Sequence, residues 1–128
     1  MYKFYPHCIK AATFEELKHF KAKANKEGVV MDNSTTYLAF FVNGMPVGFV
    51  GWMHVLGSLR YKSDWLMPEW RGQGIYKLLF AERDKILSAQ EDITAYCTQM
   101  SLPVYLANGF EVQKVLERGS TMVKRKFN

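Results

Sequence analysis

One stretch of the sequence carries the strongest structural signal: Trp65-Leu66-Met67-Pro68-Glu69-Trp70-Arg71-Gly72-Gln73-Gly74-Ile75-Tyr76. Its first residues are typical of the end of a strand, and Pro68 then turns the chain. Apolar residues at helical spacing follow from Ile75 to Leu87, so a helix is expected there. Gly72 and Gly74 keep side chains out of the turn. Backbone N–H groups at a helix start lack intrahelical partners and carry partial positive charge. The segment therefore predicts a site for a large anion such as a pyrophosphate.

The same turn has a simpler interpretation, in which it only connects a strand to a helix. That interpretation fits an isolated Arg-Gly-x-Gly motif. Here, however, the strand, the loop and the helix occur in the order that anion binding requires. Arg71 would add a permanent positive charge at the rim of such a site.

The chain before this segment predicts a helix and several strands. The first ten residues, with Tyr2 and Phe4 alternating with polar residues, are typical of a short edge strand. Thr13 and Glu16 have the spacing of a capping box, so a helix should begin there and end near Gly28. Two strand-like runs, 37–42 and 45–52, flank Asn-Gly, which is the strongest local hairpin signal. A further strand is expected over about 59–67.

The chain after this segment predicts a strand over 93–98, a short helix over 101–108 and two final strands over about 110–117 and 121–127. The order of elements mixes hairpins with strand–helix–strand crossovers. It indicates the α/β class, with a mixed sheet flanked by helices. The length of 128 residues suits a single domain that spans 1–128.

Composition narrows the functional classes. The hydrophobic share of 48% and the aromatic share of 15% exclude general disorder. The net charge of +5 suits an anionic ligand, a nucleic acid or an acidic protein and does not choose among them. No apolar run approaches the ~18 residues that a membrane span needs, and the first residues lack the pattern of a secretory signal.

Cysteines and histidines show no special spacing. Cys8 and Cys97 lie far apart, and we expect two reduced, mostly buried thiols in a cytoplasmic protein. The three histidines show no ligand spacing, so no metal is predicted.

The glycine-rich segment resembles motif A of the GNAT superfamily of N-acetyltransferases, whose pattern is (Gln or Arg)-x-x-Gly-x-(Gly or Ala). Arg71 matches the first position and Gly74 the fourth, and the preceding apolar strand and Pro68 fit the approach. Tyr76 departs from the pattern, because it stands where the family has Gly or Ala. Its phenol could crowd a diphosphate, or it could point into the domain and leave only backbone to the ligand.

A second resemblance, to motif B of the same family, lies downstream, over 101–111. There Tyr105 precedes Gly109-Phe110 and matches the tyrosine that in many members protonates the departing thiolate of CoA. Thr98 stands where the family commonly has asparagine. The resemblance covers about Tyr37 to Lys126 and implies the GNAT-like acyl-CoA N-acyltransferase fold.

The resemblance implies that acetyl-CoA, as co-substrate, binds where the strand before motif A splays from its neighbour. Backbone groups of Leu66 and Met67 would hold the acetyl carbonyl and the pantetheine arm. Arg71 would lie at the rim, and the backbone N–H groups of the next five residues would hold the diphosphate: Gly72, Gln73, Gly74, Ile75 and Tyr76.

Two residues are candidates for the general base. Alternation along a strand predicts that Arg60, Lys62 and Asp64 share the face of Leu66. Asp64 is the only carboxylate among them, so it is a candidate for the base or for a group that positions water. A structural salt bridge is the alternative role. His54 is the rival, because an unperturbed imidazole titrates near neutrality.

The acceptor is less well defined. In this family it binds opposite the cofactor, and Tyr37, Trp52 and Arg60 are the candidate contacts. Basic and aromatic groups together would suit a nucleobase, a nucleotide-linked amine or an acidic peptide. No nucleic-acid-binding motif is present, and the lysines of the first helix fit a solvated face equally well.

These observations favour an N-acetyltransferase that moves an acetyl group from acetyl-CoA to a primary amine by direct attack in a ternary complex. One alternative is a non-catalytic module of the same fold that binds nucleic acid or a protein partner. Another is an acyltransferase with a different acyl donor. The protein would be a monomer or a homodimer without membrane contact.

Overall fold

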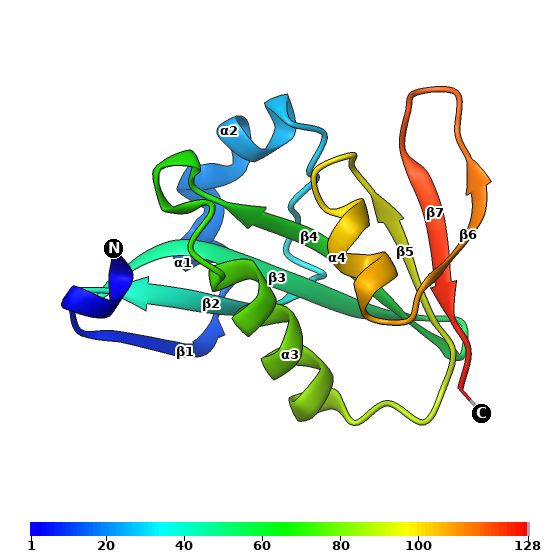
Figure 1. Cartoon of the computed structure of the whole chain (residues 1–128), viewed down its shortest axis with the longest axis horizontal. Helices are drawn as coiled ribbons and strands as arrows, with labels where there is room; N and C mark the ends of the chain where they lie inside the picture. The colour runs from blue at the N-terminus through cyan, green and yellow to red at the C-terminus, as the bar shows by residue number, and fades with distance from the viewer. Residues whose placement is uncertain (128) are drawn as a thin grey trace.

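The computed structural model describes residues 1–127 of the chain, and its centre is a single sheet of seven strands (Figure 1). The strands lie in the order β1-β2-β3-β4-β5-β7-β6. Neighbours are antiparallel except for the parallel pair β4 and β5. The bounds are β1 His7–Ala12, β2 Thr36–Val42, β3 Met45–Val55, β4 Ser58–Leu66, β5 Ile93–Cys97, β6 Glu111–Val115 and β7 Thr121–Arg125.

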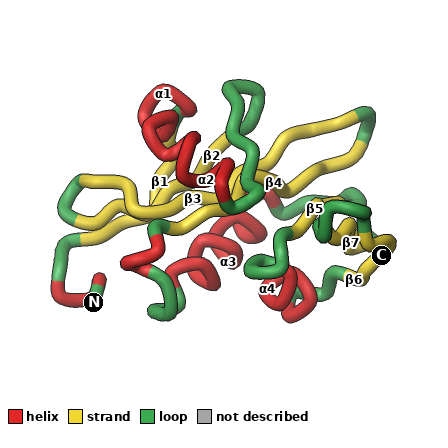
Figure 2. Tube along the Cα trace, turned by 90° about the horizontal axis from the view of Figure 1, so that it is seen from above, coloured by secondary structure: helices red, strands yellow, loops and turns green. Residues whose placement is uncertain are grey.

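Helices cover both faces of the sheet. Figure 2 shows α1 and α2 on one face and α3 and α4 on the other. Their bounds, with those of three short 3-10 helices, are α1 Phe14–Leu17, α2 Lys21–Lys26, α3 Ile75–Leu87, α4 Leu102–Ala107, η1 Tyr2–Phe4, η2 Lys18–Phe20 and η3 Pro68–Trp70. The predicted mixed sheet flanked by helices is confirmed. Within residues 1–127, no helix combines the length and the apolar character needed to cross a membrane.

Several local predictions are confirmed. Asn43 and Gly44 have φ values of 51° and 77°, as the tight turn between β2 and β3 requires. Thr13 and Glu16 form a reciprocal capping box at the start of α1. The helix α3 has the expected bounds. The buried-thiol expectation holds for Cys97 but is wrong for the exposed Cys8, and both cysteines are free.

The predicted N-terminal edge strand begins later than expected. Residues Tyr2–Phe4 form the 3-10 helix η1, and β1 starts at His7. The Tyr2 ring is buried edge-on against Phe40, with the ring centroids 5.2 Å apart, and its backbone N–H donates to the Gln73 side chain at 2.9 Å. These contacts hold the first residues against the turn before α3 instead of along the sheet edge.

A β-bulge interrupts the pairing of β3 and β4. Gly51 pairs with Lys62 but Phe49 pairs with Trp65, so Val50 on β3 faces two residues of β4. The first of these is Ser63, which has a φ of 61°. A bulge with one residue in the left-handed region bends the strand and changes which face the following side chains occupy.

The bulge overturns the prediction that Arg60, Lys62 and Asp64 share one face. Lys62 pairs with Asp32 in the loop after α2, at 2.9 Å, so it faces that side of the sheet. Asp64 pairs with a residue of α3 and therefore lies on the opposite face. Arg60, whose guanidinium stacks on the exposed side of β5, lies on the face of Lys62.

The two strands β4 and β5 pair only over a short length. Their ladder joins 59–61 to 93–95. Beyond it, β4 continues along β3, while β5 continues along β7 alone. The strands therefore diverge in the middle of the sheet, in line with the splay that the resemblance implies (Figure 1).

Candidate active site

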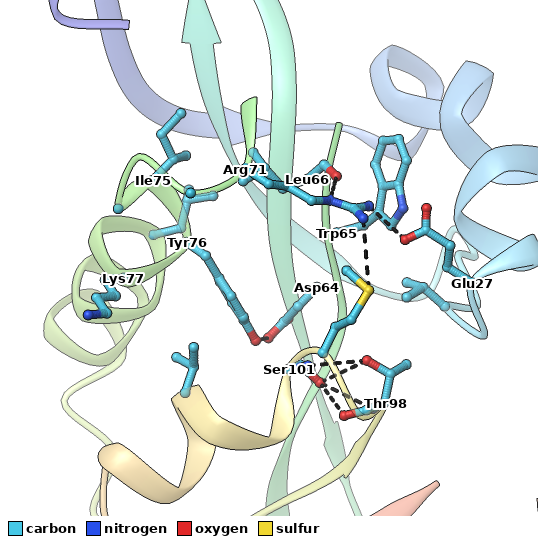
Figure 3. A pocket seen from close by; sticks show the side chains of 16 residues that line it. Glu27, Asp64, Trp65, Leu66, Arg71, Ile75, Tyr76, Lys77, Thr98 and Ser101 are labelled. Carbon is cyan, nitrogen blue, oxygen red and sulfur yellow. Dashed lines mark hydrogen bonds and ion pairs between the residues drawn. The ribbon is translucent and has the colours of Figure 1, made fainter. Parts of the chain in front are cut away.

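A cavity of about 380 Å³ lies where β4 and β5 diverge (Figure 3). Its walls come from the end of α2, the end of β4, the turn before α3, α3 itself and the segment 98–104. The volume and the mainly apolar walls with a few polar groups are typical of small-molecule sites.

The turn before α3 presents backbone donors to this cavity. Gly72 and Gly74 have φ values of 81° and 85°, in the region that favours glycine, and both line the cavity. Within residues 1–127, no atom lies within 4 Å of the place a Cβ would take on either glycine. In that same part of the chain, no group accepts a hydrogen bond from the backbone N–H groups of 72–77. The predicted anion site thus has open, unpaired donors at the start of a helix.

Arg71 lies across the cavity instead of pointing into solvent. Its Nε donates to the carbonyl of Leu66 at 2.9 Å, and its Nη2 donates to Glu27 at 2.6 Å. Its Nη1 lies 3.8 Å from the sulfur of Met100 (Figure 3). Arg71 therefore joins β4 to the residue that caps the end of α2 and to the loop before α4. Sequence reasoning missed Glu27, because only the packing of α2 brings it to the cavity.

A buried carboxylate, Asp64, lines the cavity. Its Oδ1 accepts from Nη1 of Arg83 on α3 at 2.7 Å, and its Oδ2 accepts from Nη2 at 3.1 Å. The hydroxyls of Tyr76 and Tyr105 also donate to Oδ2, at 2.6 Å and 2.8 Å. The carboxylate is 5% exposed and the Arg83 side chain is fully buried. We call Asp64, Arg83, Tyr76 and Tyr105 the buried network.

Arg83 is held from several directions. Its guanidinium carbon lies 3.8 Å from the ring centroid of Tyr61 and 4.6 Å from that of Phe80, and its Nη1 also donates to the carbonyl of Gly51 at 2.9 Å. Burial alone would lower the pKa of Arg83, but the charge and hydrogen bonds of Asp64 outweigh it and raise the pKa above its usual value. Arg83 lies four residues after Leu79, on the apolar stripe of α3. An arginine at such a buried position needs a carboxylate partner, so this spacing in the sequence could have indicated the ion pair.

The phenol of Tyr76 points into the domain, toward Asp64, and leaves the turn before α3 open (Figure 3). Of the two orientations that the sequence left open, the structure has this one. Burial, and then the negative charge of Asp64, raise the pKa values of Tyr76 and Tyr105 well above the usual value for tyrosine. Both hydroxyls therefore stay protonated at neutral pH.

The geometry disfavours both candidates for the general base. Asp64 accepts hydrogen bonds from Arg83 and two tyrosines, so the salt bridge that was its alternative role is present. His54 is exposed, lies 3.7 Å from Glu91 and pairs with Leu59, at the end of the β3–β4 ladder away from Leu66. His54 lines neither this cavity nor the second cavity that adjoins it, which is described below.

Most of the predicted cofactor residues line the cavity: Leu66, Arg71, Gly72, Gly74, Ile75 and Tyr76. Met67 and Gln73 do not; they line a separate hollow beside the N-terminal segment. The Met67 N–H already donates to the carbonyl of Val47 at 2.9 Å, and the Gln73 side chain accepts from Tyr2.

A second cavity, of about 220 Å³, adjoins the first. The two share four lining residues: Val29, Asp64, Thr98 and Ser101. Of the predicted acceptor contacts, Arg60 lines the second cavity, and so does Tyr105. Tyr37 is buried, with its hydroxyl bonded to the Asp32 backbone, and Trp52 packs toward α3 on the other face. Neither of these aromatics lines either cavity.

Metal ligands do not gather at this site. Throughout residues 1–127, no group of three or more His, Cys, Asp or Glu side chains is arranged to hold a metal ion.

Known proteins share the fold of this chain, but their sequences are only distantly similar to it. No protein-family model matches the sequence, and no curated protein matches it significantly. The chain is similar in structure to the PaiA N-acetyltransferase from Thermoplasma acidophilum in complex with coenzyme A, with a TM-score of 0.73, 16% identity and coverage of 95% of this chain and 99% of that one. An acetyltransferase of the GNAT family from Staphylococcus aureus gives a TM-score of 0.74 and 17% identity over 96% of this chain and 100% of that one.

N-acetylglutamate synthase from Neisseria gonorrhoeae, complexed with coenzyme A and N-acetyl-glutamate, gives a TM-score of 0.75 at 12% identity. The match covers 96% of this chain and 35% of that longer one. The identities are low, whereas the structural agreement extends over nearly the whole chain. This chain has the fold of the GNAT N-acetyltransferases.

Proposed function

We propose that the chain is a GNAT-type N-acetyltransferase that moves an acetyl group from acetyl-CoA to a primary amine. One observation carries the proposal: unpaired backbone N–H groups at the start of α3 face a cavity between two diverging strands. Two of the structurally similar proteins are described as complexes with coenzyme A, which supports the same ligand class here.

The residues around the cavity fit acetyl-CoA. The N–H groups of 72–77 would bind the diphosphate, and the apolar wall beyond them suits the pantetheine arm. Acetyl-CoA supplies a thioester, whose carbonyl carbon the acceptor amine attacks. The C–S bond breaks as the amide C–N bond forms, and the proton that the nitrogen loses balances the one that the thiolate gains. Tyr105 is the proposed proton donor to sulfur, because its hydroxyl stays protonated, lines the second cavity and donates to Asp64, which lines both cavities.

The orientation of Tyr76 weakens the case for a non-catalytic module. A non-catalytic module would be favoured if the Tyr76 phenol occupied the place of the diphosphate. Because the ring is turned toward Asp64, the turn before α3 has the open backbone that an anion needs.

Titration calorimetry with acetyl-CoA tests the proposal, with Gly74→Ala as the informative variant. We expect the wild-type protein to bind acetyl-CoA, and Gly74→Ala to bind at least about tenfold more weakly, because the new methyl group strains the turn and enters the anion site. Gly119→Ala is the matched control. Gly119 has a φ of 82° and an equally open surrounding but lies in the turn between β6 and β7.

Equal thermal destabilisation of the two glycine variants, with loss of binding only in Gly74→Ala, would support the site. No binding by the wild-type protein at millimolar acetyl-CoA would refute the proposed function. Equal binding by all three proteins would place the cofactor elsewhere.

Glu27→Gln is expected to strengthen the binding of acetyl-CoA by about threefold to tenfold, corresponding to roughly 1 kcal/mol. The substitution removes a negative charge from the cavity wall and releases Nη2 of Arg71 for the anionic ligand. The same calorimetric titration measures the effect. Glu15→Gln, which removes an exposed carboxylate paired with Lys18, should leave the affinity unchanged. Weaker binding by Glu27→Gln would show that the contact between Glu27 and Arg71 organises the site.

A further inference from the structure

Arg60 is a cation without a partner on the wall of the second cavity. Arg71, Arg83 and Arg125 each pair with a carboxylate, at 2.6 Å, 2.7 Å and 2.9 Å. No such carboxylate pairs with Arg60 anywhere in the part of the chain that the structure describes. Its Nε is buried and donates to no group within residues 1–127.

The position of the Arg60 side chain is nevertheless defined. Its guanidinium carbon lies 5.2 Å from the ring centroid of Tyr96 on β5, so a cation–π contact holds it against the sheet. The neighbouring cation in the same cavity, Lys62, is already neutralised by Asp32 at 2.9 Å. The uncompensated positive charge on this wall therefore belongs to Arg60.

The cavity runs from this charge to the proposed site of acetyl transfer. Asp64 and Tyr105 line it together with Arg60, and Asp64 also lines the first cavity. Arg60 and Asp64 are four residues apart on β4, which is at most about 13 Å along a strand. The second cavity, with a volume of about 220 Å³, has room for a small molecule but not for a macromolecule.

From these observations, and resting on the proposed function, we propose that the acceptor is a small amine that carries a carboxylate, which the guanidinium of Arg60 binds. A planar guanidinium offers two parallel N–H donors to a carboxylate, and it keeps its charge at all physiological pH values. The amine lies toward Asp64 and the first cavity. The carboxylate lies at the other end of the second cavity, against Arg60 and Tyr96.

A binding experiment without acetyl-CoA tests the proposed carboxylate site at Arg60. The free protein, labelled with 15N, is titrated with glutarate and separately with its neutral analogue glutaramide, and the side-chain Nε–H resonance of Arg60 is followed. The resonance is assigned by its loss in Arg60→Gln. We expect a saturable shift with glutarate and none with glutaramide. No saturable shift with glutarate, or the same shift with both compounds, would overturn the proposal.

A kinetic experiment tests the role of the site in transfer. Lysine and cadaverine form a matched pair of amines, with and without a carboxylate, as do 4-aminobutanoate and butylamine. We expect Arg60→Gln to raise KM for the carboxylate-bearing members about tenfold or more and to leave the others unchanged. Arg60→Lys should restore part of the loss, and Arg118→Gln, at an exposed arginine in the β6–β7 turn, should behave as wild type.

The two experiments separate the two proposals. Glutarate binding at Arg60 without any binding of acetyl-CoA would refute acetyl transfer but would support the carboxylate site at Arg60. Acetylation of cadaverine and butylamine as efficient as that of their carboxylate-bearing partners would refute the carboxylate-bearing acceptor and keep acetyl transfer.

Discussion

Asp64→Asn is expected to destabilise the protein by about 3–5 kcal/mol, because it leaves the charge of Arg83 buried without a counter-ion. Asparagine keeps the size of the side chain, so the change isolates the charge. The guanidinium is fully buried and lies among aromatic rings, where no solvent replaces the lost carboxylate. A domain of ordinary stability has only ~5–15 kcal/mol in total, so the loss is a large share.

Urea denaturation measures this loss. For a small domain with a slope of about 1–3 kcal/mol/M, the midpoint should fall by at least about 1 M with little change in slope. Glu15→Gln is the control for a carboxylate paired on the surface, and it should cost less than about 1 kcal/mol. Similar midpoints for the two variants would show that solvent reaches Arg83 and that the buried network is not closed.

A double replacement tests the origin of the effect. Arg83→Met removes the buried charge itself, so combining it with Asp64→Asn should recover part of the loss that Asp64→Asn causes alone. The hydroxyls of Tyr76 and Tyr105, which donate to Asp64, can also form hydrogen bonds with the side chain of an asparagine. These hydrogen bonds therefore do not require the negative charge. If the two losses simply add, Asp64 and Arg83 stabilise the fold independently of each other.

The elements that the sequence predicted correctly are those with local causes. The positive φ values of Asn43 and Gly44 are a property of that dipeptide in a tight turn. The capping box of Thr13 and Glu16 closes within one helical turn. The bounds of α3 follow from its apolar stripe and the glycine before it.

The parts that the sequence did not predict depend on contacts between distant segments. The bulge at Ser63 places a non-glycine residue at positive φ, and that residue donates its hydroxyl to the Val30 carbonyl in the loop after α2. Nothing local marks it, so strict alternation put Arg60 and Lys62 on the wrong face. The partner of Asp64 is Arg83 on α3, 19 residues along the chain, and no local pattern joins the two.

Tyr105→Phe is expected to lower the turnover of acetyl transfer by about 100-fold or more, with the affinity for acetyl-CoA nearly unchanged. The substitution removes only the hydroxyl and keeps the ring, which packs edge-on against Phe80 with centroids 4.9 Å apart. A donor with a pKa raised well above the usual value stays protonated, but the tyrosinate that it leaves is costly. Nη2 of Arg83 lies 3.5 Å from this oxygen and would stabilise the developing negative charge.

Tyr76→Phe is the matched control, because it removes the other hydroxyl that donates to the same carboxylate oxygen. If both hydroxyls serve only to satisfy Asp64, the two variants should lose similar stability and keep similar turnover. If Tyr105 protonates the departing sulfur, the two variants should have similar stability, and only Tyr105→Phe should lose turnover. Steady-state kinetics with acetyl-CoA and an acceptor amine, together with urea denaturation of both variants, separates the two roles. Full turnover in Tyr105→Phe would remove this residue as the acid and leave the buried network a purely structural part of the cleft.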